Sequence, residues 1–362
     1  MSLKRFSLIL LLPALAACGD LSARTPSVDG PASFDHAAFH PAQLTGRVLN
    51  DDPSLAMPTY VAVVGGDLVL VDPRADSTIK EIDRSDGTLV RQFGRHGEGP
   101  GEFEGPWSID PVPGSNSRFW VYDLTLTRST LVDLKTDFDG EARLGDRMMR
   151  LHGSALLEPI RVRNRIVSLG FFQKGRFAVL DDHGAFLGTV GPTPLPEQTD
   201  IPAFVRQQAY QSRMKANPSR TLLAVATRQA DRLEIYRPDG TLLTLAQRPF
   251  HFDPVFKVEE KEGRPVIATG DNLRFGYISL ATTDRRIYAL FSGRTRAGFP
   301  GEANYGRYIH VFDWSGRLLR VLKLDAAAFA VATDPGGHTL YTIRHEPTPA
   351  IMTYDLDRLA IN

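Results

Sequence analysis

Two glycine-rich segments of the chain each place an arginine shortly before a Gly-Glu pair. Gly94-Arg95 precedes Gly99-Pro100-Gly101-Glu102, and Gly293-Arg294 precedes Gly298-Phe299-Pro300-Gly301-Glu302. Successive glycine amides can point at one anion, and an arginine adds a charged donor, so this pattern suits a carboxylate, a phosphate or a sulfated sugar. The same glycines and prolines also serve to turn the chain between two strands, and both interpretations stay open.

The candidate ligand-binding set combines charged residues of these segments with nearby groups, including aromatic rings that can stack on a sugar or a peptide. Its members are Arg95, His96, Glu98, Trp107, Asp271, Arg294, Arg296, Glu302 and Tyr305. The aromatic members suit packing between neighbouring strands equally well. We treat the set as a hypothesis about where a ligand would bind.

Catalytic motifs are absent from the sequence. It contains no Gly-x-Ser-x-Gly elbow, no His-Glu-x-x-His pair and no phosphate-binding loop of the Gly-x-x-x-x-Gly-Lys type. Asp137 to Glu141 is faintly similar to a calcium loop but lacks its first acidic ligand, and the nine histidines show no metal-ligand spacing. We therefore predict no catalytic residue, no metal site and no cofactor.

The charge and cysteine content exclude several other classes of protein. The 362 residues include 42 basic and 42 acidic side chains, so no broad cationic field exists to hold nucleic acid. One cysteine is too few for an intramolecular disulfide framework, a Cys-rich zinc module or an iron–sulfur cluster. The position of that cysteine is the more informative feature.

The N-terminus has the pattern of an export signal. Lys4 and Arg5 precede an apolar run that is shorter than the ~20 residues of a membrane-spanning helix. The segment Leu15-Ala16-Ala17-Cys18 that follows resembles the lipobox of bacterial lipoproteins. The resemblance implies cleavage before Cys18 and acyl chains, palmitate among them, on that residue, which would anchor the protein to a membrane.

The lipobox resemblance also sets the expected domain boundaries and location. We expect a signal peptide at residues 1–17, a lipid-anchored flexible tether at 18–43, rich in Ser, Pro, Ala and Asp, and a folded body at 44–362. Gly19, rather than Asp, follows the cysteine, and in lipoprotein sorting patterns this favours the outer membrane. The protein is then expected in the bacterial cell envelope, facing the periplasm or the cell surface.

The folded body repeats a β-hairpin. Residues 79–90 alternate apolar and polar side chains on both sides of Asp86-Gly87, and similar hairpins turn at Asp182-His183-Gly184, Asp239-Gly240 and Ser315-Gly316. With two degenerate copies, and with two further strands before each hairpin, we count six four-stranded units, which predicts an all-β, six-bladed β-propeller. The last unit lacks one strand, so we expect residues 44–48 to complete it and close the ring; the alternative fold is a β-sandwich.

Two segments resemble a known group of propellers. Phe93 to Phe103 is similar to the inter-blade signature of NHL-like six-bladed propellers, and residues 277–290 with 310–316 are similar to the fifth blade of TolB-like propeller lipoproteins of bacteria. The resemblance implies the propeller fold and export. It carries over no functional residue.

The loop lengths suggest which face of the propeller binds a ligand. Connections after the second and fourth strands of a blade leave from one face, and to this face we assign five long loops: 94–106, 135–148, 191–208, 248–276 and 292–306. Long loops on a rigid scaffold usually carry binding, although loops also lengthen without function. We predict a monomeric, non-catalytic module that binds a protein, glycan or small molecule through this long-loop face.

The alternative function is that of a propeller hydrolase, lyase or lactonase with its active site at the channel mouth. The inner strands we expect, at 61–63, 108–109, 209–211, 277–279 and 329–331, carry few acids, with Asp110 nearly alone beside the channel. A ring of oxygen ligands for a metal is therefore missing from the predicted channel.

Overall fold

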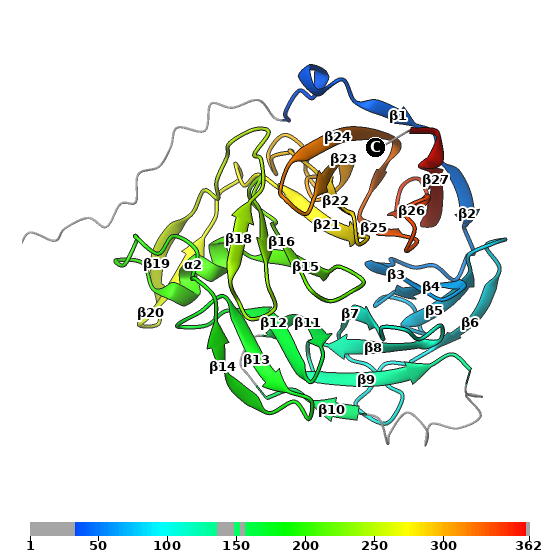
Figure 1. Cartoon of the computed structure of the whole chain (residues 1–362), viewed down its shortest axis with the longest axis horizontal. Helices are drawn as coiled ribbons and strands as arrows, with labels where there is room; N and C mark the ends of the chain where they lie inside the picture. The colour runs from blue at the N-terminus through cyan, green and yellow to red at the C-terminus, as the bar shows by residue number, and fades with distance from the viewer. Residues whose placement is uncertain (1–32, 136–147, 153–155, 360–362) are drawn as a thin grey trace, which may run out of the picture.

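Six blades, each with four antiparallel strands, are arranged around a central axis in the computed structural model (Figure 1), which describes residues 33–135, 148–152 and 156–359. The predicted six-bladed β-propeller is thereby confirmed. The predicted signal peptide, Cys18, the first part of the predicted tether and Asp137 to Glu141 lie outside the described residues.

The first three blades follow one another along the chain. Blade 1 consists of β3 (Tyr60–Val64), β4 (Asp67–Val71), β5 (Ile79–Asp83) and β6 (Leu89–Phe93). Blade 2 consists of β7 (Pro106–Pro111), β8 (Arg118–Asp123), β9 (Arg128–Asp133) and β10 (Met148–Arg150). Blade 3 consists of β11 (Leu156–Val162), β12 (Arg165–Gly170), β13 (Phe177–Asp181) and β14 (Phe186–Val190).

The other three blades complete the ring. Blade 4 consists of β15 (Ser212–Ala216), β16 (Leu223–Thr227), β17 (Leu233–Tyr236) and β18 (Leu242–Leu245). Blade 5 consists of β21 (Tyr277–Thr282), β22 (Arg286–Phe291), β23 (Gly306–Asp313) and β24 (Leu318–Ala328). Blade 6 consists of β25 (Ala330–Thr333), β26 (Thr339–Arg344), β27 (Ala350–Asp355) and β2 (Arg47–Asn50).

Burial along the strands explains why they stack as blades. The middle strand β16 is buried along its whole length, since blades pack against both of its faces, whereas the outer strand β18 is mostly exposed. The Asp-Gly turn of blade 1 fits the same packing, because Gly87 has a φ of 84° and an added Cβ would lie 1.8 Å from the Leu49 carbonyl oxygen. Only glycine therefore allows this turn to contact blade 6.

The N-terminal part of the described chain closes the ring, as predicted. Strand β2 pairs antiparallel with β27, in the register Arg47 to Thr353 and Val48 to Met352, and so supplies the outer strand of blade 6. A short strand before it, β1 (Ala42–Leu44), pairs in parallel with β24 as a fifth strand of blade 5. The chain thus spans two blades before the first complete blade begins.

Residues 34–44 form a strap that packs on blade 5, whereas the sequence suggested a flexible tether up to residue 43. The Phe34 ring stacks on Phe250 with centroids 4.4 Å apart, and the His36 ring stacks on Tyr308 at 3.6 Å. His36 also lies 3.2 Å, Nε2 to Nε2, from His310 in β23. The folded body thus begins ten residues earlier than expected, because these rings pack on residues that lie far along the chain. Between His36 and β1 lies the short 3-10 helix η1 (Ala37–Phe39).

The remaining elements lie in the connections between blades. Helix α2 (Ala203–Ala209) precedes blade 4, the hairpin of β19 (Lys257–Lys261) and β20 (Arg264–Ala268) precedes blade 5, and the 3-10 helix η2 (Asp357–Leu359) follows β27. None of the helices in the described ranges has the length and hydropathy of a membrane span.

The two faces of the ring differ as the sequence predicted, with one correction. We call the face with the first-to-second and third-to-fourth strand connections the short-turn face, and the other the long-loop face. Segment 135–148 was assigned to the long-loop face, but it joins β9 to β10, the third and fourth strands of blade 2, and so leaves from the short-turn face. The error arose because the fourth strand of this blade is short and lacks an alternating pattern.

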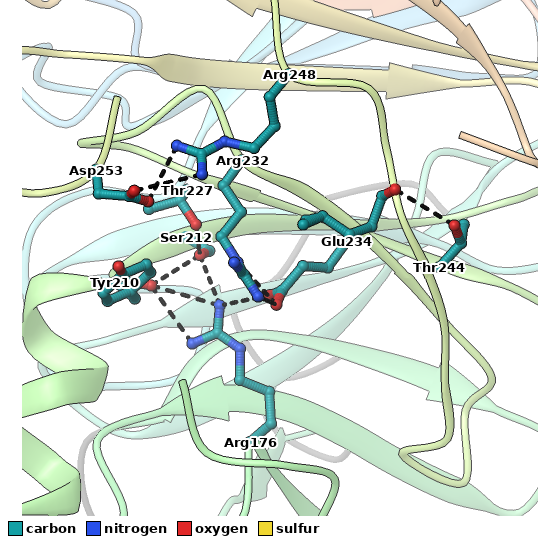
Figure 2. A network of polar contacts seen from close by, with 10 residues as sticks. Arg176, Tyr210, Ser212, Thr227, Arg232, Glu234, Thr244, Arg248 and Asp253 are labelled. Carbon is teal, nitrogen blue, oxygen red and sulfur yellow. Dashed lines mark hydrogen bonds and ion pairs between the residues drawn. The ribbon is translucent and has the colours of Figure 1, made fainter. Parts of the chain in front are cut away.

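A buried network of charged groups joins blades 3 and 4 (Figure 2). The Arg176 side chain is 2% exposed, donates to Ser212 Oγ at 2.8 Å and lies 3.5 Å from the Glu234 carboxylate, which Arg232 also contacts at 2.7 Å. Beside it, the buried Asp231 carboxylate accepts hydrogen bonds from the amides of residues 250–252. We call Arg176, Arg232 and Glu234 the sealed network.

Candidate functional site: a charged cavity in the central channel

The central channel contains a cavity of about 690 Å³. Its walls come from the inner strands of the six blades, and it reaches the short-turn face at turns such as Gly65-Gly66 and Pro113 to Asn116. A volume of this size can hold a small organic ligand. The cavity lies at the short-turn end of the channel, opposite the long-loop face that the loop lengths favoured.

A layer of side chains closes the inner end of this cavity. Tyr60, Glu158, Lys215 and Leu280 line both the large cavity and a second one of only about 10 Å³, which Arg213 and Phe329 border on the far side. The second cavity has room for about one water molecule. A ligand that enters from the short-turn face therefore ends its path at Tyr60 and Lys215.

Asp110 and Arg220 form one charged pair on the wall, next to the backbone of Arg161. Arg220, from the first turn of blade 4, reaches across blade 3 to the Asp110 carboxylate of β7, with Nη1 and Oδ1 2.6 Å apart. The other Asp110 oxygen accepts the Arg161 backbone N–H at 2.9 Å. The Arg161 guanidinium lies 3.4 Å from the centroid of Trp120, and burial lowers its pKa to about 10. Both Asp110 oxygens thus have donors within the protein.

Glu158 forms a second charged group at the inner end. It is 3% exposed, pairs with the Arg213 guanidinium at 2.6 Å and accepts the Met214 N–H at 2.7 Å. Its backbone has a φ of 53° within an irregularity of the β11–β12 register, a strained conformation for a residue that is not glycine. The bulge therefore turns this carboxylate toward Arg213 and the neighbouring blade.

Lys215 is the cation at the inner end that has no carboxylate of its own. Its Nζ donates to the Tyr60 hydroxyl across the channel and lies 4.3 Å from the centroid of that ring, while the Tyr60 hydroxyl donates to the Ile109 carbonyl. Burial lowers the pKa of Lys215 to about 8, against the opposing attraction of Glu158 and Asp110. Burial also raises the pKa of Tyr60, so the phenol stays protonated.

The charges around the cavity do not balance. Among the described residues that line it, the cations Arg84, Lys215 and Arg220 exceed the anions Asp110 and Glu158 by one. Each carboxylate is already paired with an arginine. An anionic group of a ligand would therefore meet an excess of positive charge, at Arg84 near the short-turn face and at Lys215 at the inner end.

The predicted ligand-binding residues of the first glycine-rich segment lie on the long-loop face between blades 1 and 2. The Arg95 guanidinium pairs with Glu102 at 2.7 Å, and the same carboxylate accepts the Gly99 N–H at 2.8 Å. These hydrogen bonds lower the pKa of Glu102. His96 and Glu98 are exposed beside them. A carboxylate of the chain thus occupies the position at which an external anion was expected.

The second segment is organised in a similar way between β22 and β23. Arg294 lies 3.5 Å from the Glu302 carboxylate and 4.4 Å, from Cζ to ring centroid, from Phe299. The backbone N–H groups of Arg296 and Ala297 donate to the carbonyls of Leu273 and Asp271, so the structure brings Asp271, Arg294 and Arg296 into one loop cluster.

The remaining two predicted residues have other neighbours. The Tyr305 hydroxyl contacts His345 at 2.7 Å, and the Trp107 ring faces the Arg213 guanidinium, 5.1 Å from Cζ to centroid. Blade 6 separates blades 1 and 5, from which the two glycine-rich segments leave. A ligand site on these loops stays a prediction.

Most residues of the cavity were not predicted from the sequence. Asp110 was predicted to lie beside the channel, but the inner strand of blade 4 was predicted at 209–211, whereas residues 203–209 form α2 and the strand is Ser212–Ala216. The signal for the correct position was the alternation of Arg213 and Lys215 with Met214, directly before the turn at Asn217. In an inner strand, such polar positions face the channel.

Metal binding has no basis in the geometry of the described residues. In residues 33–135, 148–152 and 156–359, no three His, Cys, Asp or Glu side chains lie together in a way that could hold a metal ion. The ionisable groups on the cavity wall are two arginines, two carboxylates that are paired with arginines, one phenol and a partly desolvated amine.

Comparisons with known proteins bear on the fold. A protein of the duf4221 family from Bacteroides vulgatus is 9% identical, with a TM-score of 0.57 over 86% of this chain and 95% of that one. The β-propeller domain of Cps50 (Swd1) from Myceliophteria thermophila is 12% identical, with a TM-score of 0.49 over 86% of this chain and 99% of that one. A search of curated proteins finds no match. The family model described as TolB-like 6-blade propeller-like matches residues 40–334, and the chain therefore belongs to the TolB-like family of six-bladed propellers.

Proposed function

We propose that this protein is a binding module that holds a small organic anion in the cavity of its central channel. The observation that carries the proposal is the combination of a cavity of about 690 Å³ with one more cation than anion on its wall. Both wall carboxylates are paired with Arg213 and Arg220, which leaves two wall cations for an incoming anion: Arg84 near the short-turn face and Lys215 at the inner end, where the path of the ligand stops. The excess positive charge and the size of the cavity together indicate a small anionic ligand.

The walls of the cavity favour a ligand with an apolar body. Between the charged groups lie apolar side chains of several blades, among them Val61, Ile109, Leu280 and Val331. Sites for small molecules combine apolar walls of this kind with a few polar groups that orient the ligand. The ligand we propose is a carboxylate or phosphate on a small apolar skeleton, with its charged end at Lys215 and its other end toward the short-turn face.

We also propose that the propeller is held at the bacterial cell envelope by lipid on Cys18, as the lipobox pattern indicates. Replacement of this thiol by Cys18→Ser should release the protein from isolated membranes into the soluble fraction. Retention of the variant on membranes would contradict the anchor. The binding proposal does not depend on that result.

A titration of the purified protein with small carboxylates and phosphates tests the binding proposal. We expect at least one ligand to bind to the wild type with measurable heat, and to bind about tenfold more weakly to Lys215→Met, because the variant loses the unmatched charge. Lys257→Met, on the exposed β19, serves as the matched control and should bind as the wild type does. Equal binding by Lys215→Met, or no binding to the wild type across the series, would contradict the proposal.

A further inference from the structure

We propose that Lys215 captures the carbonyl group of a bound oxo acid as an imine, which makes the cavity a covalent site for small aldehyde or keto acids. This inference rests on the proposed function, because it assigns the chemistry of the same cavity. It goes beyond that function by requiring a carbonyl carbon on the ligand. An anion without a carbonyl group would bind there but would not react.

The first support is the position of the amine. Lys215 lies on the inner strand β15, half-buried, and lines the cavity where the path from the short-turn face ends. The hydrogen bond to the Tyr60 hydroxyl holds Nζ at that end. A ligand that fills the cavity therefore brings its innermost atoms to the amine nitrogen.

The second support is the set of charged groups that face the amine. Glu158 and Asp110 attract the protonated form, but they are paired with Arg213 and Arg220, whose own charges repel it. The remaining partner, Tyr60, is a neutral phenol. Burial is the largest influence and lowers the pKa of Lys215 to about 8, so roughly a tenth of the amine is neutral at pH 7.

Lys80 shows that burial alone does not produce such a site. Its side chain is fully buried in blade 1, and burial lowers its pKa as well. However, its Nζ donates to Gln92 at 3.0 Å and to Ser54 at 3.4 Å, and it does not line the channel cavity. Of these two lysines, only Lys215 combines a lowered pKa with a position on the wall of a cavity that a ligand can enter.

The proposed step needs no other reagent. The lone pair of neutral Nζ attacks the carbonyl carbon, a C–N bond forms, and the carbonyl π electrons move to oxygen. The two protons of the amine end on that oxygen, the C–O bond breaks, and water leaves as the C=N bond forms. Amine and carbonyl thus give imine and water without any change in oxidation state, and the reaction reverses by hydrolysis.

Reductive trapping with glyoxylate, the smallest aldehyde acid, tests the inference. The full-length protein is incubated with glyoxylate and cyanoborohydride at pH 7, and modified lysines are located by peptide mass spectrometry. A neutral fraction of about a tenth at Lys215, against about one in 3,000 for an ordinary lysine of pKa near 10.5, predicts labelling at least about tenfold faster than at exposed Lys257. Its rate should level off above about pH 8, whereas that of Lys257 continues to rise.

Two further measurements separate capture from binding alone. Glycolate, which has the carboxylate but no carbonyl group, should compete and slow the labelling of Lys215 without affecting Lys257. Tyr60→Phe keeps the ring but removes the hydroxyl that positions the amine, and we expect its labelling to be several-fold slower with an unchanged circular dichroism spectrum.

The outcomes distinguish the inference from the proposed function. Labelling of Lys215 no faster than that of Lys257, in a protein whose cavity binds small anions by calorimetry, overturns the imine and leaves the binding site. Absence of both labelling and anion binding overturns both. If Lys215 is labelled fast and glycolate does not slow the reaction, the amine is reactive but the cavity does not bind the carboxylate group of the acid. This result would also overturn the inference.

Discussion

Two clusters of arginines and carboxylates, one in the sealed network and one in the channel, differ in what surrounds them. Arg176, Arg232 and Glu234 fill the space between blades 3 and 4, where the first and last are 2% and 3% exposed (Figure 2). The channel cluster of Arg220, Asp110, Glu158 and Lys215 also combines cations with carboxylates, but it borders a cavity of about 690 Å³.

The difference teaches that buried charge alone does not indicate function. In the sealed network the Glu234 carboxylate lies between two guanidinium groups and lines neither of the two channel cavities, so we expect its effect to be on stability. In the channel an amine faces open space with a phenol as its partner. We therefore expect substitutions in the first cluster to change the free energy of unfolding, and substitutions in the second to change binding.

The largest expected effect follows from Glu234→Leu in the sealed network. Removal of the carboxylate leaves Arg176 and Arg232 without their shared counter-ion, which typically costs about 3–5 kcal/mol of unfolding free energy. Urea denaturation followed by circular dichroism measures the loss. Anion binding in the channel should be unchanged at a temperature where the variant is folded. A change in anion affinity without a change in stability would show that the sealed network serves binding and not stability.

The next largest effect is an acid destabilisation at the strap. Burial lowers the pKa of His36 to about 4 and that of His310 well below 6.5, while the unfolded chain binds protons near pH 6.5. Stability should therefore fall as the pH drops from 6.5 to 4, by about 3 kcal/mol for His36 alone. His36→Phe, which keeps a ring on Tyr308, should reduce the dependence of the free energy of unfolding on pH between 6.5 and 4. Urea denaturation at several pH values measures this dependence, and an unchanged slope would show that His36 does not cause it.

A smaller effect of the same sign, but at higher pH, is expected at Lys215. Because its folded pKa of about 8 lies below the 10.5 of an ordinary lysine, the unfolded chain binds more protons between these values. The stability of the wild type relative to Lys215→Met should rise by about 2 kcal/mol from pH 8 to pH 10.5. Paired urea titrations at both pH values measure the difference, and a constant difference would mean that the amine is not desolvated.

The fold could be predicted from sequence because its signals are local. Alternating strands on either side of Asp86-Gly87 and Asp239-Gly240 identify hairpins, and the missing strand of the last unit leaves only the N-terminal segment to close the ring. Each hairpin inference uses residues within one short stretch of the chain. The pairing of the N-terminal strand with the last blade then follows from the number of strands in each unit.

The candidate site could not be predicted in the same way, because its contacts join distant parts of the chain. Arg220 meets Asp110 across 110 positions, and Lys215 meets Tyr60 across the channel. A boundary error at α2 displaced the inner strand of blade 4, and side chains of a strand change faces with each residue, so Lys215 was not placed in the channel. The strap was missed for a similar reason, since Phe34 packs on Phe250.

The smallest expected effect concerns the two glycine-rich loops. Because the ion pairs of Arg95 with Glu102 and of Arg294 with Glu302 each have one exposed partner, the double variant Arg95→Ala with Arg294→Ala should lower the Tm by only about 1–2 °C. We also expect equal capture of sulfated glycans by this variant and the wild type in an array and pull-down comparison. Reduced capture by the variant would establish an anion site on the long-loop face, because an external group would then displace Glu102 or Glu302 from its arginine, and the propeller would bind ligands at both ends of its channel.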